Sequence, residues 1–392
     1  MFAPGMRMAT ARLIRFQFMT GAIVVAALAV TPIAQDRPEA PAPRPSALPN
    51  PYRLVTDWPT LPAGMRGPNG QKWGEVIRVH VAPNGNIWVF QRCFNDKPTG
   101  DATCLNRGEA NPPILEFDRA GRLLRSFGVG LFAHPHGFTI DHEGNIWTTD
   151  ANGDETILGM PAKNEKGVTM GQVVLKISPE GKVLMRIGTE GVGGIGPYTF
   201  DRPTGVSIAA NGNVFVADGH SGNRSRSARI VKYAPDGTFI KAWGRLGTEP
   251  GNFREPHDLS VGGSKGYVYV ADRQNNRIQV FDQDGTFIAA WKQFGQPSSV
   301  YVDAQDNIYV GATYQDPARG SVMGPVSGAN DRAIVIGNAI TGELKYLIPD
   351  PGDLSKMTDT GTSASGIAVD AQGNVYAADV GFNNLRKYVR VQ

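Results

Sequence analysis

The segment GVSIAANGNVFVAD (residues 205–218) contains two short runs of β-branched and aromatic residues that are joined by an Asn-Gly turn. The segment ARIVKYAPDGTFIKAWG (residues 228–244) repeats this arrangement around an Asp-Gly turn. Runs of four to six such residues on either side of these turns predict β-hairpins. Two hairpins in succession predict a unit of four antiparallel strands.

The turn of the first hairpin recurs along the chain at a spacing of some tens of residues. Its six copies are Gly85-Asn86-Ile87, Gly144-Asn145-Ile146, Gly212-Asn213-Val214, Gly266-Tyr267-Val268, Asp306-Asn307-Ile308 and Gly373-Asn374-Val375. One such unit cannot bury both of its faces, so repeated units predict a radial array of sheets that pack on one another. We therefore predict an all-β fold, a six-bladed β-propeller with four-stranded blades.

The sixth copy needs a strand from elsewhere in the chain. The sequence stops soon after Leu385–Val389, which is expected to be the third strand of that copy. Residues Tyr52–Trp58 have the composition of a strand, and we predict that they complete the last blade because this removes an open sheet edge. The propeller is thus expected to span residues 52–392 and to be closed by its N-terminal strand.

Composition agrees with this fold and excludes one class of partner. The chain has 48 glycines and 28 prolines among 392 residues, as expected for many turns between short strands. The formal net charge is only +3, and lysine and arginine form no dense run. A nucleic-acid partner is therefore not expected.

Residues 1–34 have the pattern of a secretory signal peptide. Three arginines precede the apolar stretch 21–30, and Ala34 is followed by polar residues. Pro32 is unfavourable so close to a cleavage site, so an uncleaved N-terminal anchor is the alternative. We expect a periplasmic or secreted protein that associates with a membrane only if this segment stays attached.

The residues that follow also suit an exported protein. Residues 35–51 are rich in proline and predict a stiff, extended linker. The chain has two cysteines, Cys93 and Cys104, which lie in one predicted loop. Outside the cytoplasm they would be free to form a disulfide, and two unpaired thiols are the alternative.

Candidate functional residues are found by their distance from the turns. A residue eight positions before a turn and one seven positions after it both lie at the open end of the hairpin, so they share one face of the propeller. The eight-before positions, with one inserted residue in the fourth copy, are Ile77, His136, Thr204, His257, Ser298 and Ser365. The seven-after positions are Arg92, Ala151, Gly219, Arg273, Thr313 and Val380, and His220 follows Gly219.

These offsets predict a cluster of histidines and arginines at the centre of one face. His136 and His257 come from blades two and four, and alternate blades of a six-fold ring can point three side chains at the axis, as a three-ligand metal site requires. Arg92 and Arg273 come from blades one and four, on opposite sides of the ring. A lone histidine is more often structural. We interpret the histidines that do not share the offset as structural or exposed: His80, His134 and His142.

Four segments carry a family resemblance: VFVADGH (214–220), RIVKYAPDG (229–237), PHDL (256–259) and ADRQNNRIQVF (271–281). They resemble the NHL-repeat propellers and, more closely, the peptidyl-α-hydroxyglycine α-amidating lyases, and the resemblance extends over most of residues 52–392. It implies an enzyme that cleaves a peptidyl-α-hydroxyglycine to a peptide amide and glyoxylate. It also implies a zinc held by three histidines on the propeller axis, a structural calcium, two arginines and a tyrosine.

Carried over by position, the resemblance assigns roles to five residues. His136 and His257 match two of the zinc ligands, Arg92 and Arg273 match the two arginines, and Phe138 would offer its backbone carbonyl to the calcium. In these roles zinc would act as a Lewis acid on substrate oxygens, and the guanidinium groups would bind a carboxylate or a developing oxyanion.

The chain departs from the family pattern at three positions. The third zinc histidine falls on Ser365, the acidic calcium ligand on Gly366 and the tyrosine on His220. Two histidines make a poor zinc site, and the loss of the acidic ligand puts calcium in doubt. We predict that His220 replaces the third ligand, with ring nitrogens about 3 to 4 Å apart as zinc–nitrogen bonds of about 2.0 to 2.1 Å imply. A hydrogen bond of His220 at the rim is the alternative.

Three functional hypotheses follow from these residues. The first is a metal-dependent lyase acting on small hydroxylated or carboxylated substrates. The second is an exported propeller that binds a peptide or a partner protein through the same face without catalysis. The third is a hydrolase or lactonase of the wider six-bladed group, which is disfavoured because the axial offsets hold no cluster of acidic metal ligands.

Overall fold

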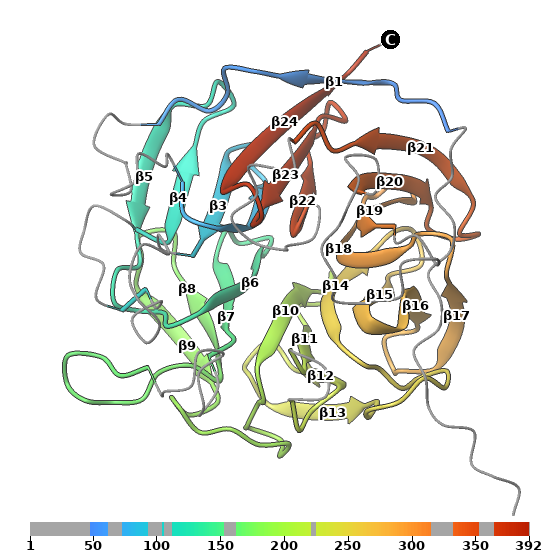
Figure 1. Cartoon of the computed structure of the whole chain (residues 1–392). Helices are drawn as coiled ribbons and strands as arrows, with labels where there is room; N and C mark the ends of the chain where they lie inside the picture. The colour runs from blue at the N-terminus through green and yellow to red at the C-terminus, as the bar shows by residue number, and fades with distance from the viewer. Residues whose placement is uncertain are drawn as a thin grey trace, which may run out of the picture. The chain divides into compact units, whose positions relative to one another are not determined.

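The strands predicted around the six turns form six four-stranded antiparallel sheets in the computed structural model (Figure 1). The structure describes residues 48–61, 73–92, 104–105, 112–152, 162–220, 225–314, 332–352 and 364–391. All of them belong to one compact unit, Asp36–Gln392. The prediction for residues 1–34 lies outside the described residues, as does most of the predicted linker.

Each sheet is one blade, and its strands follow one another in the chain. Blades one and two are β2 (Val76–Val81), β3 (Ile87–Gln91), β4 (Ile114–Phe117) and β5 (Leu123–Phe127), then β6 (Pro135–Ile140), β7 (Ile146–Asp150), β8 (Val173–Ile177) and β9 (Val183–Ile187). Blades three and four are β10 (Pro203–Ile208), β11 (Val214–Asp218), β12 (Arg229–Tyr233) and β13 (Phe239–Trp243), then β14 (Pro256–Gly262), β15 (Tyr267–Asp272), β16 (Arg277–Phe281) and β17 (Phe287–Trp291). Blade five is β18 (Gln296–Val302), β19 (Asn307–Thr313), β20 (Arg332–Asn338) and β21 (Leu344–Pro349).

Blade six joins the two ends of the propeller. It contains β22 (Gly366–Val369), β23 (Val375–Asp379) and β24 (Asn384–Arg390), and its outer strand is β1 (Tyr52–Val55). β1 pairs antiparallel with β24, from Tyr52 opposite Arg390 to Val55 opposite Lys387. In Figure 1 the blue β1 accordingly lies beside the red β24.

The first strands of the blades line the centre of the ring. β2, β6, β10, β14, β18 and β22 each contact the first strand of the next blade, and β22 contacts β2. Six hydrophobic clusters fill the spaces between the sheets, and each cluster is shared by two neighbouring blades. The all-β six-bladed propeller is therefore confirmed.

The turn that defines the repeat has a local physical cause. Gly144 has a φ of 84° in the turn between β6 and β7, in the left-handed region that glycine adopts without strain. Asp306 takes the same position in blade five with a φ of 58°. The aspartate that opens three of these turns also fixes them, since Asp141 Oδ1 accepts hydrogen bonds from the backbone N–H groups of Glu143 and Asn145. The equivalent residues Asp303 and Asp370 do the same.

Helical structure is scarce in the described part of the chain. The 3-10 helix η2 (Arg273–Asn275) follows β15. Within the described ranges, no helix has the length and apolar character needed to cross a membrane.

A truncated protein that begins at Leu61 should lose cooperative unfolding and aggregate. This truncation removes β1 and two buried aromatic side chains, Tyr52 and Trp58, the second of which packs on Tyr376 with ring centroids 5.1 Å apart. Loss of one large buried side chain costs about 3 to 5 kcal/mol, and the exposed edge of β24 would be free to pair with other chains. Urea unfolding and size-exclusion chromatography measure both effects, with a protein that begins at residue 48 as the control. Equal unfolding curves for the two proteins would contradict the closing role of β1.

Candidate metal centre

In five of the six blades, a β-bulge at the start of the first strand aims one residue at the propeller axis. The pairing with the second strand shifts at this point in five blades. A bulge leaves a residue out of the ladder and redirects its side chain. We call the bulged residues, together with Ser365 directly before β22, the first axial ring: Ile77, His136, Thr204, His257, Ser298 and Ser365. All six are buried, and they are the residues that the sequence places at the eight-before offset.

An aspartate at the end of the second strand holds the loop that precedes the bulge. Asp150 at the end of β7 accepts hydrogen bonds from the backbone N–H groups of Ala133 (2.6 Å) and His134 (2.8 Å). Asp272 at the end of β15 accepts one from Arg254 (2.9 Å) and pairs with Arg277 (2.8 Å). These loops lead directly into His136 and His257, so the repeat itself positions the two histidines.

Three imidazoles from consecutive blades meet on the axis. His136 and His257 come from β6 and β14, and His220 follows β11 in the blade between them. The ring centroid of His136 lies 4.8 Å from that of His220 and 4.9 Å from that of His257. The ring centroids of His220 and His257 are 5.4 Å apart. Their candidate ligand atoms all lie within 4.8 Å of one another. This limit is wider than the 3 to 4 Å expected for zinc-bound nitrogens.

The backbone fixes which nitrogen of two histidines is available to a metal. His136 Nδ1 lies 2.6 Å from the carbonyl oxygen of Thr204, and His257 Nδ1 lies 2.7 Å from that of Ser298. A carbonyl oxygen only accepts, so each Nδ1 carries the proton and each Nε2 keeps its lone pair. His136 Nε2 is buried and has no hydrogen-bond partner among the described residues. A histidine whose second nitrogen is held by a carbonyl is the usual form of a metal ligand.

The three imidazoles are also neutral at physiological pH. Burial lowers the pKa of His136 well below the usual histidine value, and the neighbouring His220 and His257 lower it further. Burial and the positive charge of Arg273 act in the same direction on the pKa of His257. Burial lowers the pKa of His220 to about 4 against the opposing effect of Glu255. Neutral imidazoles can bind a metal ion without first losing a proton.

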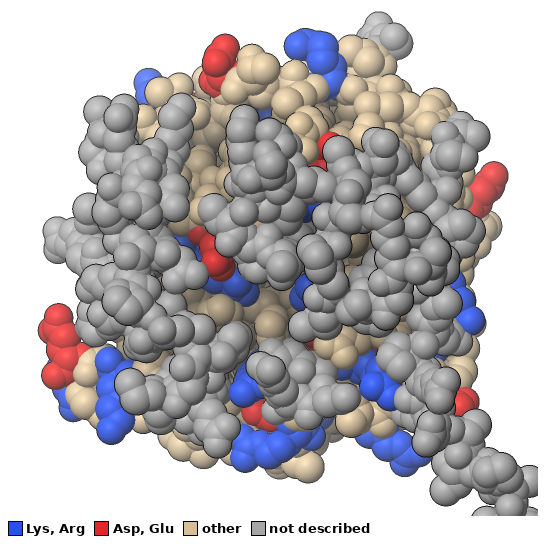
Figure 2. All heavy atoms as spheres, in the orientation of Figure 1, with Lys and Arg blue, Asp and Glu red and all other residues tan. Residues whose placement is uncertain are grey.

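The two predicted arginines lie at this mouth, and each has an acidic partner that the offsets did not reveal. Arg92 pairs with Glu75 at 2.9 Å and donates to the carbonyl oxygen of Pro135 at 3.2 Å. Arg273 Nη1 lies 3.8 Å from Glu255, whose other contacts include His220 Nε2 at 3.8 Å. Figure 2 shows acidic and basic side chains next to one another near the middle of the face in view. Both glutamates stand two residues before the bulge, a position outside the two offsets.

The remaining histidines differ in their relation to the cluster. His134 stands at its edge, with ring centroids 6.2 Å from His136 and 6.4 Å from His220. Neither offset reveals this, because His134 stands two residues before the bulge. His80 is half-buried and lies 3.5 Å from Thr139 Oγ1, and His142 is exposed.

The calcium that the resemblance implies does not fit the described residues. Gly366 supplies no side-chain oxygen, and a Cβ atom added there would lie 2.7 Å from the Cα atom of Arg78. The Arg78 guanidinium, a cation, already donates to the backbone carbonyl of Ser365 and to that of His257 at 3.2 Å. The Phe138 side chain packs on Phe90, with ring centroids 5.3 Å apart.

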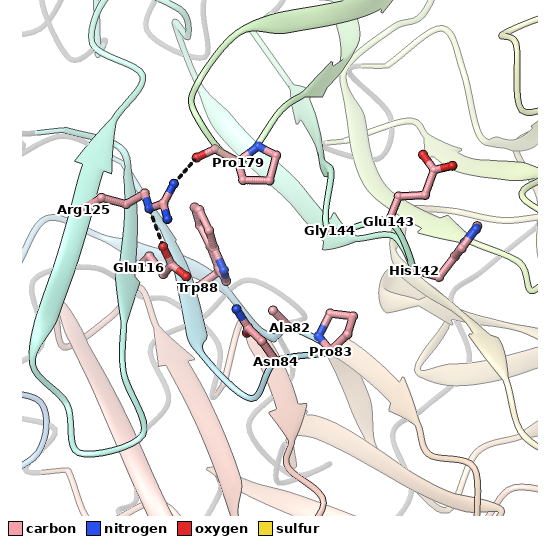
Figure 3. A pocket seen from close by; sticks show the side chains of 10 residues that line it. All are labelled: Ala82, Pro83, Asn84, Trp88, Glu116, Arg125, His142, Glu143, Gly144 and Pro179. Atoms are coloured by element: carbon pink, nitrogen blue, oxygen red, sulfur yellow. Dashed lines mark hydrogen bonds and ion pairs between the residues drawn. The ribbon is translucent and has the colours of Figure 1, made fainter.

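A separate hollow of about 290 Å³ lies at the opposite ends of the strands, between the turns of blades one and two (Figure 3). Arg125 lies at one side of it, pairing with Glu116 at 2.6 Å and donating to the carbonyl oxygen of Pro179 at 3.0 Å. Trp88 and His142 also line it. Its arginine is paired with Glu116, and Glu143 lies 3.5 Å from Lys176 Nζ, so the hollow offers less to a ligand than the histidine cluster does.

Cys104 is buried and disulfide-bonded. Cys93, the other cysteine of the predicted loop, lies outside the described residues.

Comparison with known proteins places this geometry in a class. A family model of the NHL repeat matches residues 253–281, which include His257 and Asp272. NHL repeat-containing protein 3 of Homo sapiens is 28% identical over 348 residues, or 86% of this chain and 84% of that protein. The X-ray structure of a suspected gluconolactonase shares the fold, with a TM-score of 0.52 and 11% identity over 90% of this chain and 97% of that one. The chain is a six-bladed β-propeller that contains an NHL repeat at residues 253–281.

Within that class, the resemblance to one enzyme group is supported. A probable peptidyl-α-hydroxyglycine α-amidating lyase of Caenorhabditis elegans is 32% identical over 216 residues, or 53% of this chain. The match spans about half of that protein, 55% of its length. The chain thus resembles the amidating lyases.

Replacing Asp150 by asparagine should lower the free energy of unfolding by about 1.5 to 3 kcal/mol, the usual value of hydrogen bonds to a charged group. Asparagine has one acceptor oxygen where Asp150 uses both for Ala133 and His134. Urea unfolding measures the loss, and Asp303→Asn in a turn at the other end of the strands is the matched control. Both variants should be less stable, but only Asp150→Asn should weaken metal binding at His136. Equal metal binding by the two variants would show that the loop does not depend on Asp150.

Proposed function

We propose that this protein is a zinc-dependent lyase of the amidating type that acts on small hydroxylated and carboxylated substrates. The observation that carries the proposal is the meeting of His136, His220 and His257 on the axis, with the Nδ1 atoms of His136 and His257 held by backbone carbonyls. Three nitrogen ligands with one open position are typical of catalytic zinc sites. Zinc bound there would supply a Lewis acid for a substrate oxygen.

The residues around the histidines suit an α-hydroxyglycine. Arg92 and Arg273 lie at the mouth and offer guanidinium donors to the substrate carboxylate. The family tyrosine is replaced by His220, so the proton of the substrate hydroxyl needs another acceptor. Glu255 is the candidate, because its carboxylate is buried and lies 3.8 Å from His220 Nε2.

In this reaction the atoms balance without an oxidant. Glu255 takes the proton of the hydroxyl group, and the oxygen forms a carbonyl with the α-carbon. The bond between that carbon and the amide nitrogen breaks, and its electron pair goes to the nitrogen. The nitrogen takes up a proton, so the products are a peptide amide and glyoxylate.

One observation favours a non-catalytic, binding propeller as the second candidate. Arg92 and Arg273 are each paired with a glutamate, Glu75 and Glu255. Paired arginines bind an added carboxylate less strongly than free ones. A peptide with acidic and basic side chains could instead contact both members of these arginine–glutamate pairs, and it would then be held without being cleaved. In either case we propose that the protein is exported, on the basis of the signal-like pattern of residues 1–34.

Zinc binding tests the site directly. Protein stripped of metal and titrated with zinc against a chromophoric chelator should bind one zinc ion per chain. His136→Ala, His220→Ala and His257→Ala should each weaken binding by about 100-fold or more, since even the loss of a partner of a ligand costs about 10- to 100-fold. His142→Ala, on the exposed opposite end, is the matched control and should bind like the unaltered protein.

Two outcomes of the zinc titration would contradict the proposal. Absence of stoichiometric zinc in the unaltered protein would exclude the zinc site and favour the binding propeller. Stoichiometric zinc in His220→Ala, together with its loss in His136→Ala, would show that His220 is not the third ligand.

Substrate binding tests the arginines. Replacement of Arg92 or Arg273 by lysine should weaken the binding of glyoxylate roughly tenfold, about 1.4 kcal/mol, because lysine keeps the charge but loses the two-pronged hydrogen bond. Isothermal titration measures this, with exposed Arg122→Lys as the control. Zinc-loaded protein should also release glyoxylate from a peptidyl-α-hydroxyglycine. Glyoxylate binding unchanged in both variants would remove the arginines from the site.

A further inference from the structure

Arg78 lies on the propeller axis next to the histidine cluster and contacts four blades. Its Nη1 atom donates to the carbonyl oxygen of Ile77 at 3.0 Å and to that of Ser365. Its Nη2 atom donates to the carbonyl oxygens of His257 at 3.2 Å and Thr204 at 3.4 Å. The four carbonyls belong to residues of the first axial ring in blades one, three, four and six. One guanidinium thus binds the backbone of the ring on several sides.

The fifth blade is joined to this group through a carboxylate. Asp258 Oδ1 lies 3.4 Å from Arg78 Nη2, and Asp258 Oδ2 accepts a hydrogen bond from the backbone N–H of Val300 in β18 at 3.1 Å. Both side chains are buried. A buried cation is stable only when it is paired and hydrogen-bonded, as Arg78 is here.

Arg78 and Asp258 are members of a second axial ring, formed by the residue after each bulge. Its members are Arg78, Gly137, Gly205, Asp258, Ser299 and Gly366. The glycines are required because the blades approach one another closely here. A Cβ atom added at Gly137 would lie 2.9 Å from the Cα atom of Gly205, and one added at Gly205 would lie 3.0 Å from Asp258 Oδ1. At Gly366 it would lie 2.7 Å from the Arg78 Cα atom. The second ring is therefore built around one arginine and one aspartate.

This ring leaves no place for a divalent cation. Inward-facing carbonyls and one carboxylate are the ligands that calcium takes, but here they already bind the guanidinium group. Asp258 is the one acidic residue of the ring, and its charge is matched by that of Arg78.

The same contacts reach the proposed zinc ligands. The carbonyl of Thr204 accepts from both Arg78 Nη2 and His136 Nδ1, and the carbonyl of His257 belongs to a ligand itself. Loss of Arg78 would free these carbonyls to move and would leave Asp258 as an unpaired buried charge. Groups that orient a ligand in this way affect metal affinity although they do not touch the metal.

We propose that Arg78 is a built-in axial cation that takes the place of a structural calcium and positions His136 and His257. The fold then needs no calcium, and Arg78 acts as a positioning residue for the histidine site. The positioning half of this inference rests on the proposed zinc site, whereas the calcium half does not.

The calcium half is tested on the unaltered protein. Its thermal unfolding temperature should change by less than about 1 °C when excess calcium chloride or the chelator EGTA is added, because a ligand that does not bind the native state does not stabilise it. A rise of several degrees with calcium, reversed by EGTA, would overturn the inference.

The positioning half is tested with Arg78→Met and Arg78→Lys. Zinc affinity, measured by competition with a chromophoric chelator, should fall about tenfold or more in Arg78→Met and less in Arg78→Lys. The matched control is Arg332→Met, which removes a buried arginine paired with Asp379 at 3.1 Å but touches no carbonyl of the first axial ring in the bonds described. The control should lose stability and keep its zinc affinity.

Each further outcome decides the inference. Equal zinc affinity in Arg78→Met and Arg332→Met would overturn the positioning role, and if Arg78→Met does not fold, unchanged affinity in Arg78→Lys would do so. If the unaltered protein binds no zinc, the proposed function and the positioning role both fail, while the response to calcium still decides whether Arg78 replaces that ion.

Discussion

Six strands that converge on one axis must satisfy the backbone groups that they bring together, and the guanidinium of Arg78 meets this requirement. A bulge at the start of five of the six first strands takes a residue out of the sheet ladder and leaves carbonyls directed at the centre. Buried carbonyls without partners are costly. Arg78 binds those of Ile77, Thr204 and His257, and Asp258 balances its charge.

The histidine site depends on this arrangement and on the neighbouring loops. The carbonyls of Thr204 and Ser298 hold the Nδ1 atoms of His136 and His257, so the bulged residue of the next blade decides which nitrogen stays available. Asp150 and Asp272 hold the loops that enter the two bulges. Burial then keeps the imidazoles neutral by lowering their pKa values. The repeat structure and the candidate metal site therefore use the same hydrogen bonds.

The fold could be read from the sequence because its signals are local. The six turns need a left-handed residue at one position, which glycine or aspartate supplies, and the number of residues from turn to bulge is fixed by the strand length. His220 stands one position beyond those offsets, and the placement of His136 and His257 on one face followed from them. The roles of Arg78, Glu75, Glu255 and His134 did not, because each depends on how a side chain crosses to another blade. The one local signal of the axial cation is the position of Arg78 among the apolar residues of Val76–Val79, which are buried.

The positions of the three histidines show how such a site can differ from its relatives. Each blade offers two places near the axis, the bulge before the hairpin and the residue that follows the second strand. His136 and His257 use the first place, whereas His220 uses the second. It follows Gly219, which has a φ of 136°, and the backbone N–H of His220 donates to the carbonyl oxygen of Arg202 at 3.1 Å. A metal requires only that the nitrogens converge, not that they come from alternate blades. A serine at position 365 is thus compatible with three nitrogen ligands, provided that the blade between His136 and His257 supplies the third.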